Sequence, residues 1–210
     1  MNIVFEGVNG AGKSTIIKKL VSLMIQDNMD VKYVDDLDIS TPTFSVLANM
    51  FKSSPFLELK TGFNTSLTES LILAADYHYL KEMLKNVEGY KIFDRDFFTT
   101  LTYQSYFLEK YYNDDKLVNC FKELLLYDPK EINMIVYVDV DFETSLIRTE
   151  NRDKRKFTWE EKATLKYFIN KLKEEVINYS ANKNIPLLII DGRDDIYENA
   201  NKIFMKIKNI

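Results

Sequence analysis

A glycine-rich run near the start of the chain has the residue types and spacing of a phosphate-binding loop. Gly7 is followed after four residues by Gly12, Lys13 and Ser14, between an apolar segment at 3–5 and a helical pattern. In that setting the backbone N–H groups turn inward around phosphates, the lysine reaches the β- and γ-phosphates, and the hydroxyl binds Mg²⁺. A glycine-rich turn that only joins a strand to a helix is the alternative. The full pattern favours a nucleoside triphosphate as the ligand.

A charged cluster, Asp94-Arg95-Asp96, directly follows an apolar segment that we predict to be a strand. Asp94 could hold Mg²⁺ through its water shell, and Arg95 could bind a second phosphate, that of an acceptor. Asp96 could orient Arg95 or cap the following helix, on which Tyr103 and Gln104 could meet a sugar or base. A structural ion pair at the end of a strand is the alternative interpretation.

A basic run at 148–156 contains three of the chain's five arginines. Arginine has a planar fork that binds phosphate oxygens bidentately, so its position is informative in a chain with 28 Lys and Arg residues. A solvated helix end is the ordinary interpretation of such a run. Because it follows the fourth predicted strand, it could also cover bound phosphates, and we expect a basic lid at about 148–157.

The composition limits the classes of protein that the chain can belong to. A length of 210 residues suits one well-buried domain, and a net charge of −4 argues against a general nucleic-acid binder. Cys120 is the only cysteine, which excludes an intramolecular disulfide and a cysteine-rich metal site. Met1 leads directly into an apolar segment, and no apolar run approaches the length of a membrane span. We expect a cytoplasmic protein that binds small molecules, and neither nucleic acid nor a membrane.

Short apolar runs alternate with longer segments of helical period, which is typical of a parallel sheet covered on both faces. Each predicted strand ends in an acidic residue, at the edge where ligands of open α/β sheets bind. The strands are predicted at 2–6, 31–35, 90–94, 134–139 and 187–191. The helices are predicted at 14–26, 44–51, 66–86, 99–112, 115–127, 142–151, 158–182 and 196–208.

These elements predict an α/β fold of the P-loop NTPase kind. We expect a three-layer sandwich with a five-stranded parallel sheet, helices on both faces and the basic lid, in a single domain spanning 1–210. His78 is expected on a helix surface or in packing. Trp159 is expected to anchor the helix that follows the lid in the core.

The motifs together resemble the thymidylate kinase family, over nearly the whole chain and in the same order. The resemblance rests on four segments: Phe5-Glu6-Gly7-Val8-Asn9-Gly10-Ala11-Gly12-Lys13-Ser14-Thr15, Ala74-Ala75-Asp76-Tyr77, Asp94-Arg95 with Tyr103-Gln104 after it, and the basic run. It implies transfer of the γ-phosphoryl group of ATP, with Mg²⁺, to a deoxynucleoside monophosphate, most commonly dTMP to dTDP. It also implies a homodimer.

Carried over onto this chain, the resemblance implies four groups of site residues. The catalytic residues would be Lys13, Asp94, Arg95, Arg152 and Arg155, with one of the last two arginines neutralising charge in the transition state. The ATP-binding residues would be Gly7, Val8, Asn9, Gly10, Ala11, Gly12, Lys13, Ser14, Thr15 and Arg148. The acceptor-binding residues would be Asn9, Asp36, Leu73, Tyr77, Arg95, Thr99, Thr100 and Tyr103. Ser14 and Asp94 would hold the metal, partly through water.

The chain departs from the family at acceptor positions. Asn9 stands where the family has Asp, Leu73 where it has a base-stacking Phe, and Tyr77 where it has a base-reading Arg. The segment 35–38 replaces a Glu-Pro-Gly-Gly turn. Two alternatives to a monophosphate kinase therefore stay open. One is a deoxynucleoside kinase, which needs a carboxylate base such as those at 35, 36 or 38. The other is a non-catalytic module that binds ATP as a switch.

Overall fold

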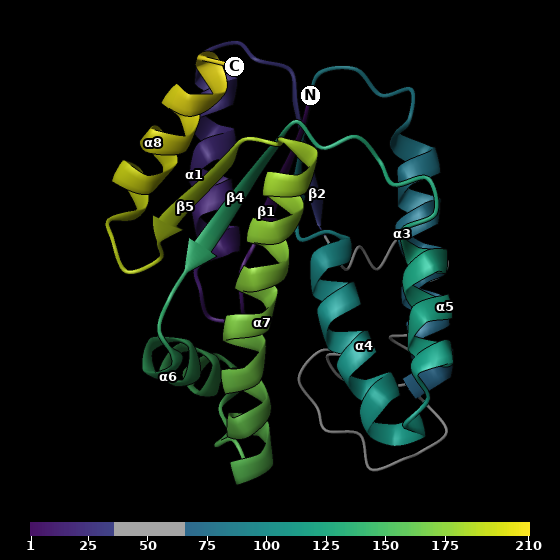
Figure 1. The fold of residues 1–210 in the computed structure, drawn as a ribbon. Coiled ribbons are helices and arrows are strands. Elements are labelled where there is room, and N and C mark those ends of the chain that lie inside the picture. Colours follow the sequence, from purple (N-terminus) through teal and green to yellow (C-terminus); the bar gives the residue numbers. More distant parts are fainter. Residues whose placement is uncertain (36–65) are drawn as a thin grey trace. The chain divides into compact units, whose positions relative to one another are not determined.

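The structure, a computed structural model, describes residues 1–35 and 66–210 (Figure 1). The helix predicted at 44–51 and the acceptor candidate Asp36 lie outside these residues. The described chain forms two compact units. The sheet unit comprises 1–35, 88–96 and 131–210, and the helical unit comprises 66–87 and 97–130. Each unit is described by itself.

The sheet unit contains five parallel strands in the order β2-β3-β1-β4-β5. They are β1 (Asn2–Glu6), β2 (Val31–Asp35), β3 (Tyr90–Asp94), β4 (Met134–Asp139) and β5 (Leu187–Asp191). All five have the predicted bounds. The central strands are apolar almost throughout because both of their faces are covered. Phe5 pairs with Asp94 on β3 and with Val136 on β4, so β1 ends between two neighbours at the carboxyl edge.

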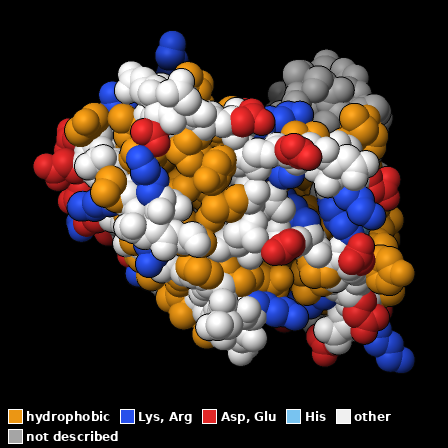
Figure 2. Space-filling view, turned by 90° about the horizontal axis from the view of Figure 1, so that it is seen from above, with side chains coloured by type: hydrophobic (Ala, Val, Ile, Leu, Met, Phe, Trp, Pro, Cys, Tyr) orange, Lys and Arg blue, Asp and Glu red, His pale blue; other side chains and the backbone are white. Residues whose placement is uncertain are grey.

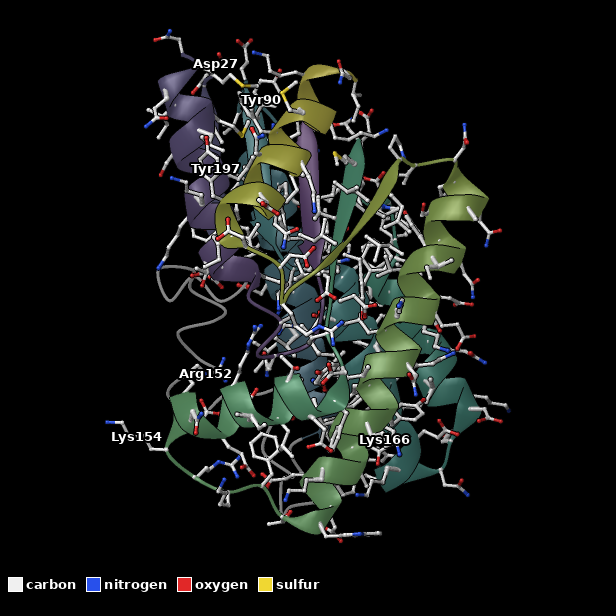
Figure 3. The ribbon with its side chains drawn as sticks, turned by 90° about the vertical axis from the view of Figure 1, so that its left-hand side faces the viewer. Asp27, Tyr90, Arg152, Lys154, Lys166 and Tyr197 are labelled. Carbon is white, nitrogen blue, oxygen red and sulfur yellow. The ribbon has the colours of Figure 1, made fainter. Side chains whose placement is uncertain are left out.

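Helices cover both faces of the sheet. Right-handed crossovers place α1 (Lys13–Gln26) and α7 (Trp159–Lys183) on opposite faces, because the chain moves from β1 towards β2 in one direction and from β4 to β5 in the other. The last helix, α8 (Ile196–Lys208), packs against α1. Figure 3 shows α1 and α8 together on one side of the strands and α7 on the other. The three-layer prediction is confirmed.

The connection between α6 (Phe142–Asp153) and α7 corrects one prediction. Trp159 is not a core anchor, because 82% of its surface is exposed. The buried face of α7 runs through Glu161, Leu165 and Phe168, and at 100° per residue Trp159 points about 200° away from Glu161. Phe157, which precedes the N-cap Thr158, is the aromatic residue that is buried here.

The helical unit contains α3 (Ser66–Leu84), α4 (Phe97–Tyr112) and α5 (Asp115–Leu125), which pack against one another. His78 Nε2 lies 2.9 Å from the carbonyl oxygen of Leu124, so the histidine links α3 to the end of α5. The Ser70 hydroxyl donates to Gln104 Oε1 at 2.9 Å and joins α3 to α4. The helices end within two residues of the predicted bounds.

The surface of the described residues mixes both signs of charge. On the face that Figure 2 shows, acidic and basic side chains are interspersed among hydrophobic and polar ones. Cys120 is exposed. Among the helices of the described residues, none is long and apolar enough to cross a membrane.

Candidate active site

The glycine-rich run at 7–12, which we term the phosphate loop after its sequence pattern, forms a tight loop between β1 and α1. Gly12 is the N-cap of α1 with a φ of 98°, so the first N–H groups of the helix face the loop without a side-chain cap. Gly10 has a φ of 74°, and a Cβ there would lie 2.7 Å from the carbonyl oxygen of Ser145 and 2.9 Å from Thr149 Oγ1. Only glycine therefore lets α6 pack directly on the loop.

Lys13 places its charge against the loop. The residue is only 6% exposed, and its Nζ donates to the carbonyl oxygens of Gly7 at 2.8 Å and Val8 at 3.2 Å. This holds an ammonium group beside the inward-facing backbone of the loop. A cation in this place can neutralise phosphate oxygens.

A carboxylate at the end of β3 meets two hydroxyls from neighbouring elements. Ser14 Oγ donates to Asp94 Oδ2 at 2.5 Å, and the Tyr33 hydroxyl donates to the same oxygen at 3.3 Å. Carboxylate and hydroxyl oxygens suit Mg²⁺, which binds one or two carboxylates and keeps phosphate and water ligands. The described residues contain no group of three or more His, Cys, Asp or Glu side chains that could hold a metal ion. An ion at Ser14 and Asp94 would take its other ligands from phosphate and water.

Arg95 lies beside the phosphate loop. It is buried, with 8% of its surface exposed, and its Nη2 donates to Asn9 Oδ1 at 2.5 Å. Its backbone has a φ of 83°. The Arg95 N–H donates to the carbonyl oxygen of Phe5 at 2.8 Å, and the next N–H, that of Asp96, donates to Glu6 Oε1 at 2.8 Å. The fold thus brings together Arg95 and Asn9, two predicted acceptor-binding residues from distant parts of the sequence.

Arg148 on α6 bridges two loops. Its Nη1 donates to the carbonyl oxygens of Gly10 at 3.2 Å and Gly192 at 2.9 Å. The loop after β5 approaches the phosphate loop so closely that a Cβ at Gly192 would lie 2.2 Å from the carbonyl oxygen of Ala11. Ser145 also donates from α6, to the carbonyl oxygen of Asn9 at 2.7 Å.

A cavity of about 360 Å³ opens beside these contacts. It is lined by Gly12, Thr15, Ile16, Arg148 and residues 192–196. Arg193 lies in its wall, with Nη2 at 2.6 Å from Asp191 Oδ2 and Nη1 at 2.8 Å from Asp141 Oδ2. Hydrogen bonds from the Arg193 side chain and backbone lower the pKa of Asp191 to about 2. The cavity is continuous with the start of α1 and can take the base and sugar of a nucleotide whose phosphates lie in the loop.

The two other lid arginines have different surroundings. Arg152, 56% exposed at its side chain, pairs with the adjacent Asp153 at 2.7 Å; it lies near the end of α6, where Lys154 extends away from the helix (Figure 3). Arg155 pairs bidentately with Glu161 at 2.8 and 3.1 Å and lies 4.8 Å from the ring centre of Phe157. Glu161 also closes the capping box of α7. The exposed ion pair with Asp153 restrains the Arg152 side chain less than the pair with Glu161 restrains Arg155.

The remaining acceptor candidates lie on two helices of the helical unit. Leu73 and Tyr77 come from α3, and Thr99, Thr100 and Tyr103 come from α4; all five are buried. The Tyr77 hydroxyl accepts a hydrogen bond from the N–H of Lys130 at 3.3 Å, and its ring meets Phe97 edge to face at 6.0 Å. Tyr77 therefore has a structural role within this unit.

Sequence reasoning missed three side chains that contact the predicted site residues: Glu6, Tyr33 and Ser145. Glu6 was visible only as part of the loop motif, and it ends β1 directly before the first glycine. Tyr33 and Ser145 carried no local signal, because their contacts bridge 61 and 136 residues of sequence.

Known proteins match the chain along almost its whole length. The family model for thymidylate kinase matches residues 5–203. A probable thymidylate kinase of Methanobrevibacter smithii is 28% identical over 208 residues, which are 99% of this chain and 92% of that protein. A thymidylate kinase of Acholeplasma laidlawii is 27% identical over 198 residues, which are 93% of this chain and 92% of that protein.

Solved structures share the fold. Deoxyadenosine kinase from M. mycoides with bound dATP has a TM-score of 0.68 and 18% identity, covering 99% of this chain and 100% of that one. The same enzyme with dCMP and dCDP has a TM-score of 0.67 and 19% identity. The likeness confirms the P-loop NTPase α/β fold. Because the thymidylate kinase model matches far more than half of this chain, the chain belongs to the thymidylate kinase family and is a phosphotransferase.

Proposed function

We propose that the protein transfers the γ-phosphoryl group of ATP to a deoxynucleoside monophosphate, with dTMP as the first candidate. The observation that carries this proposal is the buried residue Arg95, whose guanidinium donates to Asn9 of the phosphate loop at 2.5 Å. A permanently charged fork beside a triphosphate loop can hold a second phosphate next to the first. The thymidylate kinases among the relatives support dTMP as the acceptor.

On the donor side, Lys13 and the loop N–H groups would bind the phosphates, and the cavity at 192–196 would take the adenosine. Ser14 and Asp94 would hold Mg²⁺, which supplies charge neutralisation to the phosphates when bound. Arg148 would fix the position of α6 over the loop. Arg152, whose exposed pair is the more easily broken, is the better candidate for an arginine that moves towards the transferred group.

A monophosphate acceptor also suits the chemistry of the described site. A phosphate with a second pKa near 6 is already largely dianionic at neutral pH and needs no general base. The task that remains is to align two anions and neutralise their charge. Arg95 and Lys13 provide two buried cations for that task.

A deoxynucleoside kinase is the second candidate, because the solved structures that share the fold belong to a deoxyadenosine kinase. That reaction must remove a proton from a hydroxyl, usually with a carboxylate at the end of a strand. Asp35 ends β2 and would be the described candidate for that base.

The test compares acceptors and an Arg95 variant. The protein is incubated with labelled ATP and Mg²⁺ and with a panel of deoxynucleosides and their monophosphates, and we expect dTMP to be phosphorylated best. Arg95→Ala should raise KM for dTMP by about 10- to 100-fold, because a charged hydrogen-bond partner of the acceptor is lost, and leave KM for ATP nearly unchanged.

Lys166→Ala is the matched control, since it removes an exposed cation of α7 outside the site (Figure 3). Its kinetic constants should equal those of the wild type. Phosphorylation of thymidine without phosphorylation of dTMP would overturn the proposal in favour of the nucleoside kinase. Tight ATP binding with no acceptor phosphorylated would instead indicate a switch module.

A further inference from the structure

Arg95 adopts a backbone conformation that its residue type disfavours. Six non-glycine residues of the described chain have a positive φ. Four are Asn or Asp, which tolerate the left-handed region, and the fifth, Lys154, is the C-cap of α6. Those five are exposed, whereas Arg95 is buried. A strained residue that is buried at a site persists only where its surroundings hold it.

The end of β1 holds Arg95 on both sides. The N–H of Arg95 donates to the carbonyl oxygen of Phe5 at 2.8 Å, in line with the pairing of Phe5 and Asp94. The next N–H, that of Asp96, donates at 2.8 Å to the side chain of Glu6. Where the backbone pairing of β1 and β3 ends, a side-chain carboxylate of β1 therefore accepts the next N–H.

Glu6 is suited to this task. It is completely buried, and a buried carboxylate binds N–H donors more strongly than a neutral acceptor does. Its backbone leads directly into the phosphate loop, while its side chain binds the turn at Arg95. The turn directs the Arg95 guanidinium to Asn9 of that loop.

We propose that Glu6 is a positioning residue, whose carboxylate binds the Asp96 N–H and fixes the left-handed backbone of Arg95, thereby orienting its guanidinium for the acceptor phosphate. The role in binding the acceptor rests on the function proposed above. The hold on the backbone does not.

Two substitutions separate the hydrogen bond from packing. Glu6→Gln keeps a side-chain oxygen that can accept from the Asp96 N–H, and Glu6→Met keeps a similar volume without that oxygen. We expect Glu6→Met to raise KM for dTMP by about tenfold with KM for ATP unchanged, since one hydrogen bond to a charged group is lost. Glu6→Gln should restore KM for dTMP to within about twofold to threefold of the wild type.

A double-mutant cycle tests whether Glu6 acts through Arg95. In an Arg95→Ala background, Glu6→Met should not raise KM for dTMP further, because the positioned side chain is already absent. Additive effects of the two substitutions would overturn the proposal. A loss of kcat with both KM values unchanged would also overturn it.

Hydrogen exchange provides a measurement that does not depend on turnover. The Asp96 amide should exchange faster in Glu6→Met than in the wild type and in Glu6→Gln, while the amides of Val4 and Ile92 within the strands stay protected. Equal exchange at Asp96 in all three proteins would overturn the proposal. If the wild type phosphorylates no monophosphate, the proposed function fails, and the exchange comparison still decides whether Glu6 holds Arg95.

Discussion

One oxygen of Asp94 accepts hydrogen bonds from two different elements beside the phosphate loop. Oδ2 accepts from Ser14 and from Tyr33, two hydroxyls that come from α1 and β2. The pairing of Tyr33 with Ile92 explains the second contact, because Ile92 and Asp94 are two residues apart and lie on the same face of β3. Tyr33 therefore restrains the carboxylate from the neighbouring strand while Ser14 faces it from the first turn of α1.

Tyr33→Phe should weaken the use of Mg²⁺. The substitution keeps the ring and removes one of two donors that orient Asp94, so we expect the half-saturating Mg²⁺ concentration to rise by about 2- to 10-fold. Titration of the initial rate with Mg²⁺ at saturating ATP measures this. Tyr90→Phe is the control, because Tyr90 lies at the opposite end of β3 (Figure 3). An unchanged Mg²⁺ requirement in Tyr33→Phe would show that the phenol does not orient Asp94.

At the level of the elements, the strands were predictable and part of the site was not. Each strand is a short apolar run that ends in an acidic residue, and this pattern gave all five bounds. The phosphate-binding roles of Lys13 and Ser14 were predicted from their spacing to the glycines that precede them. Glu6 and Tyr33 did not, because their bonds depend on which strands are neighbours and in what register.

The start of α7 shows a different reason for failure. Trp159 was expected to anchor α7 in the core, but the position of a residue on the helix decides which way its side chain points. The N-cap at Thr158 and the capping box with Glu161 fix the rotation of the first turn. That rotation buries Glu161 and exposes Trp159, and it leaves the core position to Phe157.

Substitutions at the two aromatic residues should therefore have unequal effects. Phe157→Ala should lower the free energy of unfolding by about 3 kcal/mol, because it empties a buried site. Trp159→Ala should change it by less than about 0.5 kcal/mol, because the residue is 82% exposed. Urea denaturation followed by circular dichroism measures both. A larger loss for Trp159→Ala would show that its ring packs in solution in a way that the structure lacks.

At the scale of the molecule, the groups around the phosphate loop belong to one unit although they are scattered through the sequence. β1, β3 and β4 are neighbours in the sheet, and their carboxyl ends bring together the phosphate loop, the Asp94-Arg95 turn and α6. The loop after β5 completes the cavity. Asn9 and Arg95 are the acceptor candidates of this unit, whereas those on α3 and α4 belong to the helical unit. Binding of ATP and binding of the acceptor should therefore slow amide hydrogen exchange in different segments of the chain.

Hydrogen exchange with ligands tests this division. ATP with Mg²⁺ should slow amide exchange at 7–15, 145–149 and 191–196, because these segments surround the loop and the cavity. Addition of dTMP should then slow exchange at 97–104 of the helical unit, while α5 at 115–125 serves as the internal control. If thymidine protects 97–104 as well as dTMP does, the acceptor phosphate contributes nothing to binding, and Arg95 is not its clamp. Protection by ATP alone at 97–104 would show that the helical unit responds to the donor, and the assignment of the acceptor to it would be wrong.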